Sequence, residues 1–110
     1  MIDWQRVINL KNEIGQGDFD EVVPLFLEEV SEITNRLKKT PILDQLETDL
    51  HSLKGCALNL GFSEFSMMCS KGESLAAKGG AGSVDLAAIL TSFDISCEEF
   101  LNGLEHGKIS

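Results

Sequence analysis

Three residues on one flank of a predicted helix have side chains suited to phosphoryl transfer. His51 offers an imidazole, which in its neutral form is a nucleophile at physiological pH. Lys54 follows three residues later and falls on the same side of the helix, where its charge would stabilise phosphoryl oxygens in a loose transition state. Gly55, one residue further, has no side chain to obstruct a docking partner. The spacing therefore predicts an exposed nucleophile that attacks an acyl phosphate presented by another protein.

Each of these residues has a simpler explanation when it is taken alone. A single histidine is usually a polar surface residue, and a lysine on a helix is usually a solvated charge. Glycine inside a helix costs about 1 kcal/mol relative to alanine, so Gly55 indicates close approach by another group, either a neighbouring helix or a partner. Leu58 falls near His51 and either contacts the partner or extends the core. The four residues predict a site because they share one flank of the helix.

The flank is defined by the apolar stripe opposite to it. At about 100° per residue, six apolar side chains fall on one face of this predicted helix: Leu43, Leu46, Leu50, Leu53, Ala57 and Leu60. His51 lies roughly 130° from the centre of that stripe and is expected to project into solvent. Cys56 is expected nearer the core than the site.

The segment from His51 to Gly61 reads H-S-L-K-G-C-A-L-N-L-G, and it resembles the H-x-L-K-G-x-x-x-x-L-G signature of histidine-containing phosphotransfer (HPt) domains. The run Phe26-Leu27-Glu28-Glu29 is similar to the family's F-L-x-x region. The resemblance implies that His51 is phosphorylated, that Lys54 stabilises the phosphoryl group and that Gly55 admits a receiver domain. Gly61 would have a structural role, as the glycine that ends the active-site helix.

The same resemblance implies the partners and the cofactors. The chain would accept a phosphoryl group from the aspartyl phosphate of a response-regulator receiver domain, or from a sensor histidine kinase, and pass it to another receiver. It would be a covalent carrier and not an enzyme, because the sequence has no Gly-rich phosphate loop for ATP. We expect no cofactor on this chain, with Mg²⁺ held by the receiver domain.

Apolar spacings of three and four predict an all-α fold, an antiparallel up-down-up-down four-helix bundle with a short extra N-terminal helix. The predicted helices span residues 3–13, 21–39, 42–60, 64–78 and 84–105. Asp20, Ser63 and Ser83 are predicted N-caps, and Pro24 is placed in or near a first turn. The second helix would bury one stripe, made of Val22, Leu25, Phe26, Val30, Ile33 and Leu37.

Composition limits the remaining classes. The chain has 110 residues, which suits one domain over residues 1–110, and its net charge of −9 argues against binding nucleic acid or a membrane surface. Three scattered cysteines and the expected lack of a signal peptide favour the cytoplasm. The opening Met1 favours a separate protein, and we expect a monomer.

Two other functions agree less well with the residues and their spacing. A helical adaptor that binds a receiver or kinase without being phosphorylated would have no need of an exposed nucleophile. A metal-binding bundle lacks a suitable ligand set, because the acidic groups Glu28-Glu29-Glu32 and Glu98-Glu99 have no histidine at helical spacing. His106 is expected to be a solvent-exposed tail residue, and the pair Met67-Met68 to belong mostly to the core, with Phe62, Phe65, Phe93 and Phe100.

Overall fold

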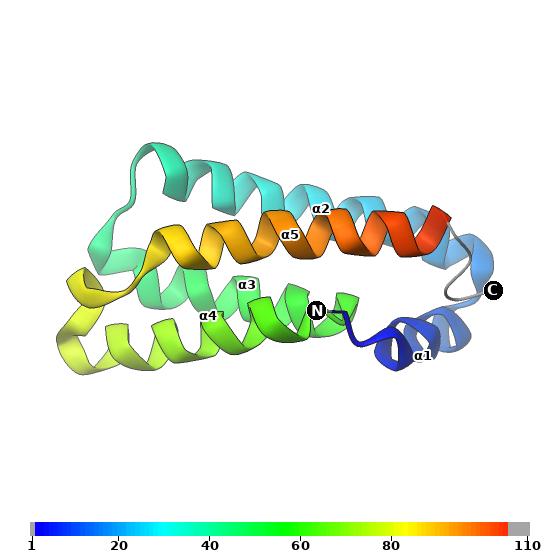
Figure 1. The fold of residues 1–110 in the computed structure, drawn as a ribbon, viewed down its shortest axis with the longest axis horizontal. Coiled ribbons are helices and arrows are strands. Elements are labelled where there is room, and N and C mark those ends of the chain that lie inside the picture. Colours follow the sequence, from blue (N-terminus) through cyan, green and yellow to red (C-terminus); the bar gives the residue numbers. More distant parts are fainter. Residues whose placement is uncertain (1, 106–110) are drawn as a thin grey trace.

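The computed structural model describes residues 2–105, and these residues form an all-helical fold, as predicted (Figure 1). In this part of the chain, five α-helices are accompanied by three short segments: η1 (Leu43–Gln45) and η3 (Ala81–Ser83) are single turns of 3-10 helix, and η2 (Ala76–Gly80) is a π-helical turn. The elements in chain order are α1 (Trp4–Ile14), α2 (Gln16–Lys39), η1 (Leu43–Gln45), α3 (Leu46–Leu60), α4 (Ser63–Leu75), η2 (Ala76–Gly80), η3 (Ala81–Ser83) and α5 (Leu86–Glu105). No described residue belongs to a strand, and one isolated bridge pairs Ile2 with Phe62.

The four long helices lie lengthwise, and the chain reverses direction between each helix and the next (Figure 1). α3 packs against both α2 and α4, and α4 packs in turn against α5. α1 contacts α2 and α3 and lies at the right-hand end of the molecule in Figure 1. Because α3 has a helix on either side, its rotation about its own axis is fixed from two directions.

The predicted stripe on α3 is buried, with one exception. Five residues of the stripe are at most 1% exposed: Leu46, Leu50, Leu53, Ala57 and Leu60. Leu43 is 53% exposed, so its place in the core was wrongly predicted. The reason is that α3 begins at Leu46 and not at Ile42, and Leu43 belongs to the 3-10 turn that precedes it. The five buried residues leave the opposite flank of α3 facing solvent.

The stripe on α2 is also shifted from the prediction. Its buried residues are Phe19, Val23, Val30, Thr34 and Leu37, which follow one another at helical spacings. Val30 and Leu37 were predicted correctly, and Phe26 and Ile33 are partly buried against the core. Leu25 lies off this stripe and is 62% exposed. The four aromatic rings predicted for the core, Phe62, Phe65, Phe93 and Phe100, are all buried. Of the methionine pair predicted with them, Met68 packs partly against the core, whereas Met67 is 51% exposed and was wrongly predicted.

All three predicted N-caps are wrong. α2 begins directly after Gly15, whose φ of 87° makes the sharp junction with α1, so Asp20 lies inside the helix and accepts from Gln16 Nε2. Pro24 likewise lies inside α2 and not in its first turn. Ser63 is the first residue of α4, with Phe62 as its N-cap. α5 begins at Leu86, and the Asp85 carboxylate accepts from the Ala88 backbone N–H, which makes Asp85 the cap in place of Ser83.

Within residues 2–105, no helix combines the length and the apolar character needed to cross a bilayer. The cysteines Cys56, Cys69 and Cys97 are all free thiols. Cys56 is 9% exposed, which confirms its predicted place near the core.

Gly61 ends α3 with a backbone that only glycine adopts readily. Its φ of 73° and ψ of 20° lie in the left-handed region, and its N–H donates to the Ala57 carbonyl oxygen. The segment before α1 passes directly over it, since the Asp3 N–H donates to the Gly61 carbonyl oxygen at 2.6 Å. A Cβ atom at this position would lie 2.5 Å from the Asp3 carbonyl oxygen. The glycine is therefore required by both the backbone conformation and the space.

We predict that Gly61→Ala lowers the free energy of unfolding by about 1–3 kcal/mol, because the substitution adds strain to the backbone and a clash with the Asp3 carbonyl. Urea unfolding followed by circular dichroism measures the change. Gly55→Ala is the control, since a Cβ atom there meets nothing within 4 Å and alanine favours the helix interior. Equal stability of Gly61→Ala and the unsubstituted protein would contradict the prediction.

Candidate functional site

His51 lies on the solvent-facing flank of α3, where the sequence predicts it. Its side chain is 68% exposed, while its chain neighbour Leu50 is completely buried. The difference follows from the helical rotation of about 100° per residue, which carries one side chain into the core and the next to the surface. The imidazole is therefore accessible to another macromolecule without any rearrangement of the bundle.

Glu73 on α4 brings His51 and Lys54 together. Glu73 Oε2 lies 2.8 Å from His51 Nδ1, and Glu73 Oε1 accepts a hydrogen bond of 2.7 Å from Lys54 Nζ. The two oxygens of one carboxylate are thus used by two residues of α3. The Glu73 side chain is only 19% exposed, so it is held more firmly than an ordinary surface glutamate. We call His51, Lys54 and Glu73 the surface triad.

The charge state of Glu73 decides which nitrogen of His51 is nucleophilic. The hydrogen bond from Lys54 has the largest effect and lowers the pKa of Glu73; burial opposes it, and the contact with His51, a smaller effect than burial, lowers the pKa again. At neutral pH Glu73 is therefore a carboxylate, which can only accept hydrogen bonds. The proton between the two residues accordingly belongs to His51 Nδ1. In the neutral ring the lone pair is then on Nε2, the nitrogen that points away from Glu73.

Gly55 and Leu58 extend the surface next to the triad. A Cβ atom on Gly55 would meet nothing within 4 Å, so this glycine does not make room for another helix of the same chain. Leu58 is 55% exposed and does not extend the core. Of the alternatives left by the sequence, the structure favours an open backbone at Gly55 and an apolar surface residue at position 58.

Gly72 explains how α4 comes close enough for Glu73 to reach α3. It is buried, and a Cβ atom on it would lie 2.9 Å from Leu50 Cδ1 and 3.2 Å from Ile89 Cδ1. Leu50 and Gly72 directly precede His51 and Glu73 in the chain. The contact between the first pair therefore sets the second pair opposite each other across the surface.

α2 fixes α3 from the other side through an ion pair between a partly exposed arginine and a buried aspartate. Arg36 donates two hydrogen bonds to the Asp49 carboxylate, of 3.0 and 2.6 Å, and this bidentate contact raises the pKa of Arg36. Asp49 is 7% exposed and lies two residues before His51. The helix that carries the imidazole is thus tied by charged contacts to both α2 and α4.

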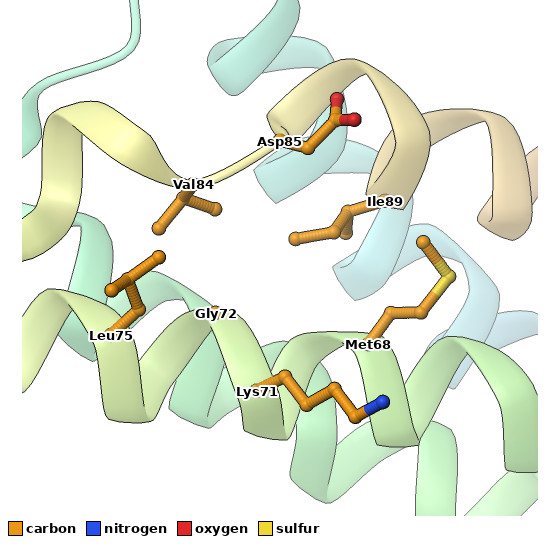
Figure 2. Close-up of a pocket in the computed structure, with 7 residues that line it drawn as sticks. All are labelled: Met68, Lys71, Gly72, Leu75, Val84, Asp85 and Ile89. Atoms are coloured by element: carbon orange, nitrogen blue, oxygen red, sulfur yellow. The ribbon is translucent and has the colours of Figure 1, made fainter.

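A separate apolar pocket lies where α4 meets the start of α5. Figure 2 shows the residues that line it, Met68, Lys71, Gly72, Leu75, Val84, Asp85 and Ile89. The pocket is on the side of α4 that faces α5, whereas Glu73 reaches towards α3. It does not contribute to the triad.

Among residues 2–105 no group of three His, Cys, Asp or Glu side chains is placed to hold a metal ion. His106, which the sequence predicts to be an exposed tail residue, lies outside the described residues.

Glu73 is the site residue that sequence reasoning missed. It lies 22 residues after His51 on another helix, outside any local motif. The signal available was the adjacent Gly72, a glycine inside a predicted helix, which indicates close packing at that point. Nothing in the spacing along α3 indicates which residue of α4 faces His51.

The chain matches a protein-family model over most of its length. The model described as Hpt domain matches residues 21–106 of the chain. The matched region contains α3, α4 and the whole surface triad. Comparisons with curated proteins and with solved structures found no match.

We predict that Lys54→Met raises the pKa of Glu73 towards its ordinary value of 4.5, because the largest cause of its lowering is removed. Carbon-13 NMR titration of the glutamate carboxyl groups measures the shift. Lys71→Met is the matched control, since it removes a charge two residues from Glu73 on the exposed side of α4. The lowered pKa of Glu73 also makes the stability of the fold depend on pH. The Lys54 contact stabilises the fold at neutral pH and is lost as the pH falls through the lowered pKa of Glu73.

Proposed function

The chain belongs to the Hpt domain family, whose members take part in phosphorelay signalling, and on this premise we propose that it carries a phosphoryl group on Nε2 of His51. The observation that carries the proposal is the surface triad. One ring nitrogen is held by Glu73 at 2.8 Å, while the ring itself remains largely exposed. A binding surface alone would not need a histidine whose tautomer is fixed in this way.

The proposed reaction is the transfer of a phosphoryl group from an aspartyl phosphate of a receiver domain. The Nε2 lone pair attacks phosphorus, the bond from phosphorus to the aspartyl oxygen breaks, and its electron pair restores the aspartate carboxylate. The transition state carries much of its charge on the phosphoryl oxygens. Lys54, one turn from His51 and half-buried, supplies a positive charge beside them. Mg²⁺ would be held by acidic residues of the receiver and would neutralise the remaining charge.

Gly55 and Leu58 are the proposed contact region for the receiver. The open backbone at Gly55 lets the partner's catalytic loop approach the imidazole, and Leu58 offers an apolar contact that excludes water. The chain reversals between α2, α3, α4 and α5 support the up-down-up-down bundle that we infer for this family member. In such a bundle the reactive helix is a rigid platform and the partner supplies the mobile loops.

The proposed protein is a phosphocarrier without its own ATP site. It would receive its phosphoryl group from a receiver domain or a sensor histidine kinase and return it to another receiver. We place it in the cytoplasm as a monomer, and its free cysteines agree with a reducing compartment.

We predict that His51→Gln abolishes phosphorylation of this chain by a phosphorylated receiver, because glutamine has no nucleophilic nitrogen. The label on the unsubstituted protein should be acid-labile and stable in base. His106→Gln is the control, since it removes the other histidine and should leave the labelling unchanged. Labelling of His51→Gln at the normal rate would refute the site. If the unsubstituted chain and His51→Gln both bind the receiver and neither becomes labelled, a non-phosphorylated adaptor is favoured.

We predict that Gly55→Gln slows transfer from a receiver about tenfold or more, because a side chain at this position obstructs the docked partner. Labelling by phosphoramidate, a small donor that needs no docking surface, should remain within about twofold of the normal rate. Quench-flow transfer assays and phosphate-affinity gels measure the two rates. Equal loss with both donors would place the effect on His51 itself and would contradict a role in receiver access.

A further inference from the structure

We propose that Glu73 keeps the proton on Nδ1 of His51 after Nε2 has been phosphorylated, and that this makes the phosphohistidine a labile, readily transferred intermediate. The inference rests on the proposed function and concerns the second half of its cycle. It assigns Glu73 a positioning role that acts on the leaving group as well as on the nucleophile.

The geometry that supports the inference is unchanged by phosphorylation of the ring. Nε2 is the nitrogen remote from Glu73, so a phosphoryl group on it leaves the contact of 2.8 Å between Nδ1 and Glu73 Oε2 in place. Glu73 is also held from its other oxygen by Lys54 at 2.7 Å. The carboxylate therefore has little freedom to turn away from the phosphorylated ring.

The chemical balance needs no proton donor in either direction. When neutral His51 attacks, its ring becomes an N-phosphorylated imidazolium with the proton still on Nδ1. When an aspartate of a second receiver attacks phosphorus, the bond from phosphorus to Nε2 breaks and its electron pair returns to Nε2. The product is the starting tautomer, with the proton on Nδ1 and the lone pair on Nε2. The carboxylate stabilises the positive ring in the phosphorylated state.

The position of that proton controls how easily the group leaves. A ring that keeps its Nδ1 proton departs as neutral imidazole, whereas a ring that has lost it must depart as an imidazolate anion, which is a much poorer leaving group. A hydrogen bond to an ionised acceptor favours the protonated ring. We therefore expect both transfer to an aspartate and attack by water to be faster than in a ring without Glu73.

Other charged residues lie within about one turn of His51 along α3. Lys54 lies one turn after His51 and opposes the effect of Glu73, because its charge disfavours a positive ring. Glu47 lies one turn before His51, is exposed, and acts in the same direction as Glu73 through solvent. Arg36 and Asp49 form their own ion pair between α2 and α3. Glu73 differs from all of these in its direct contact with the ring nitrogen.

The test compares the decay of purified phosphoprotein in the unsubstituted chain and in Glu73→Gln. Both are loaded with phosphoramidate, freed of donor, and followed by phosphorus-31 NMR between about pH 5 and about pH 9. We expect Glu73→Gln to lose its phosphoryl group about tenfold more slowly at neutral pH, with the acid-promoted part of its profile displaced to lower pH. Glu47→Gln makes the same change of charge one turn from His51 without touching Nδ1, and it should decay within about twofold of the unsubstituted protein.

The outcomes separate this inference from the proposed function. Equal decay of Glu73→Gln and the unsubstituted protein at every pH, or faster decay of the variant, would overturn the role of Glu73 and leave the carrier function standing. Failure of the unsubstituted protein to become labelled on His51 would overturn the carrier function itself. Nitrogen-15 NMR of the phosphorylated, unsubstituted protein gives an independent reading. A pyridine-like signal for Nδ1 at neutral pH would also overturn the inference.

Discussion

The close packing of α4 against α3 is the constraint on which the site depends. Gly72 has no side chain, and a Cβ atom there would lie within 2.9 Å of Leu50 Cδ1. This contact lies in the core, but its consequence appears on the surface, where the next residue of each helix forms the pair of His51 and Glu73. A larger residue at position 72 would move the carboxylate relative to the ring. The hydrophobic core and the reactive surface are thus set by the same helix-helix distance.

The net charge of the chain bears on how firmly the surface triad could hold a phosphoryl group. The chain carries a net charge of −9, and the proposed intermediate adds a phosphoryl group with about two more negative charges. In the proposed reaction Lys54 would stabilise that group, yet in the unphosphorylated protein its ammonium is already engaged by Glu73. The site therefore offers modest stabilisation to the bound phosphoryl group. For a carrier this is useful, since a group held too firmly would not pass to the next aspartate.

The part of the site that lies on one helix was predictable, and the part between helices was not. His51, Lys54 and Gly55 follow one another at helical spacing, so the stripe of leucines on α3 was enough to place all three on the exposed flank. Glu73 depends on the register between α3 and α4, which no local pattern reports. The same distinction explains Leu25, because the rotation of α2 was predicted from hydrophobicity without knowledge of the face that its neighbours cover.

The helix boundaries show a second limit of local reasoning. Asp20, Ser63 and Ser83 all have side chains that suit an N-cap, but a cap forms only where the backbone leaves the helix. Gly15 permits an abrupt turn at positive φ, which lets α2 start at Gln16 and include Asp20. Asp85 is closer to the true start of α5 than Ser83 and takes its role. Residue type therefore identifies several possible N-caps, and the point at which the chain reverses direction determines which of them begins the helix.

The contacts that fix α3 indicate which groups the chain would supply to the proposed reaction and which its partner would supply. α3 is fixed by the Arg36–Asp49 pair on one side and by Glu73 on the other, so the nucleophile is oriented before any partner arrives. In the proposed reaction the chain would contribute the nucleophile, one cation and a fixed tautomer, and the partner would contribute the metal ion and the second carboxylate. Because the proton on Nδ1 is held by Glu73 throughout the inferred cycle, the site has no step that favours one direction. In the proposed function, the relative stabilities of the aspartyl phosphates on the receivers would then determine the direction of transfer. The exposed surface around Gly55 and Leu58 would discriminate between receivers.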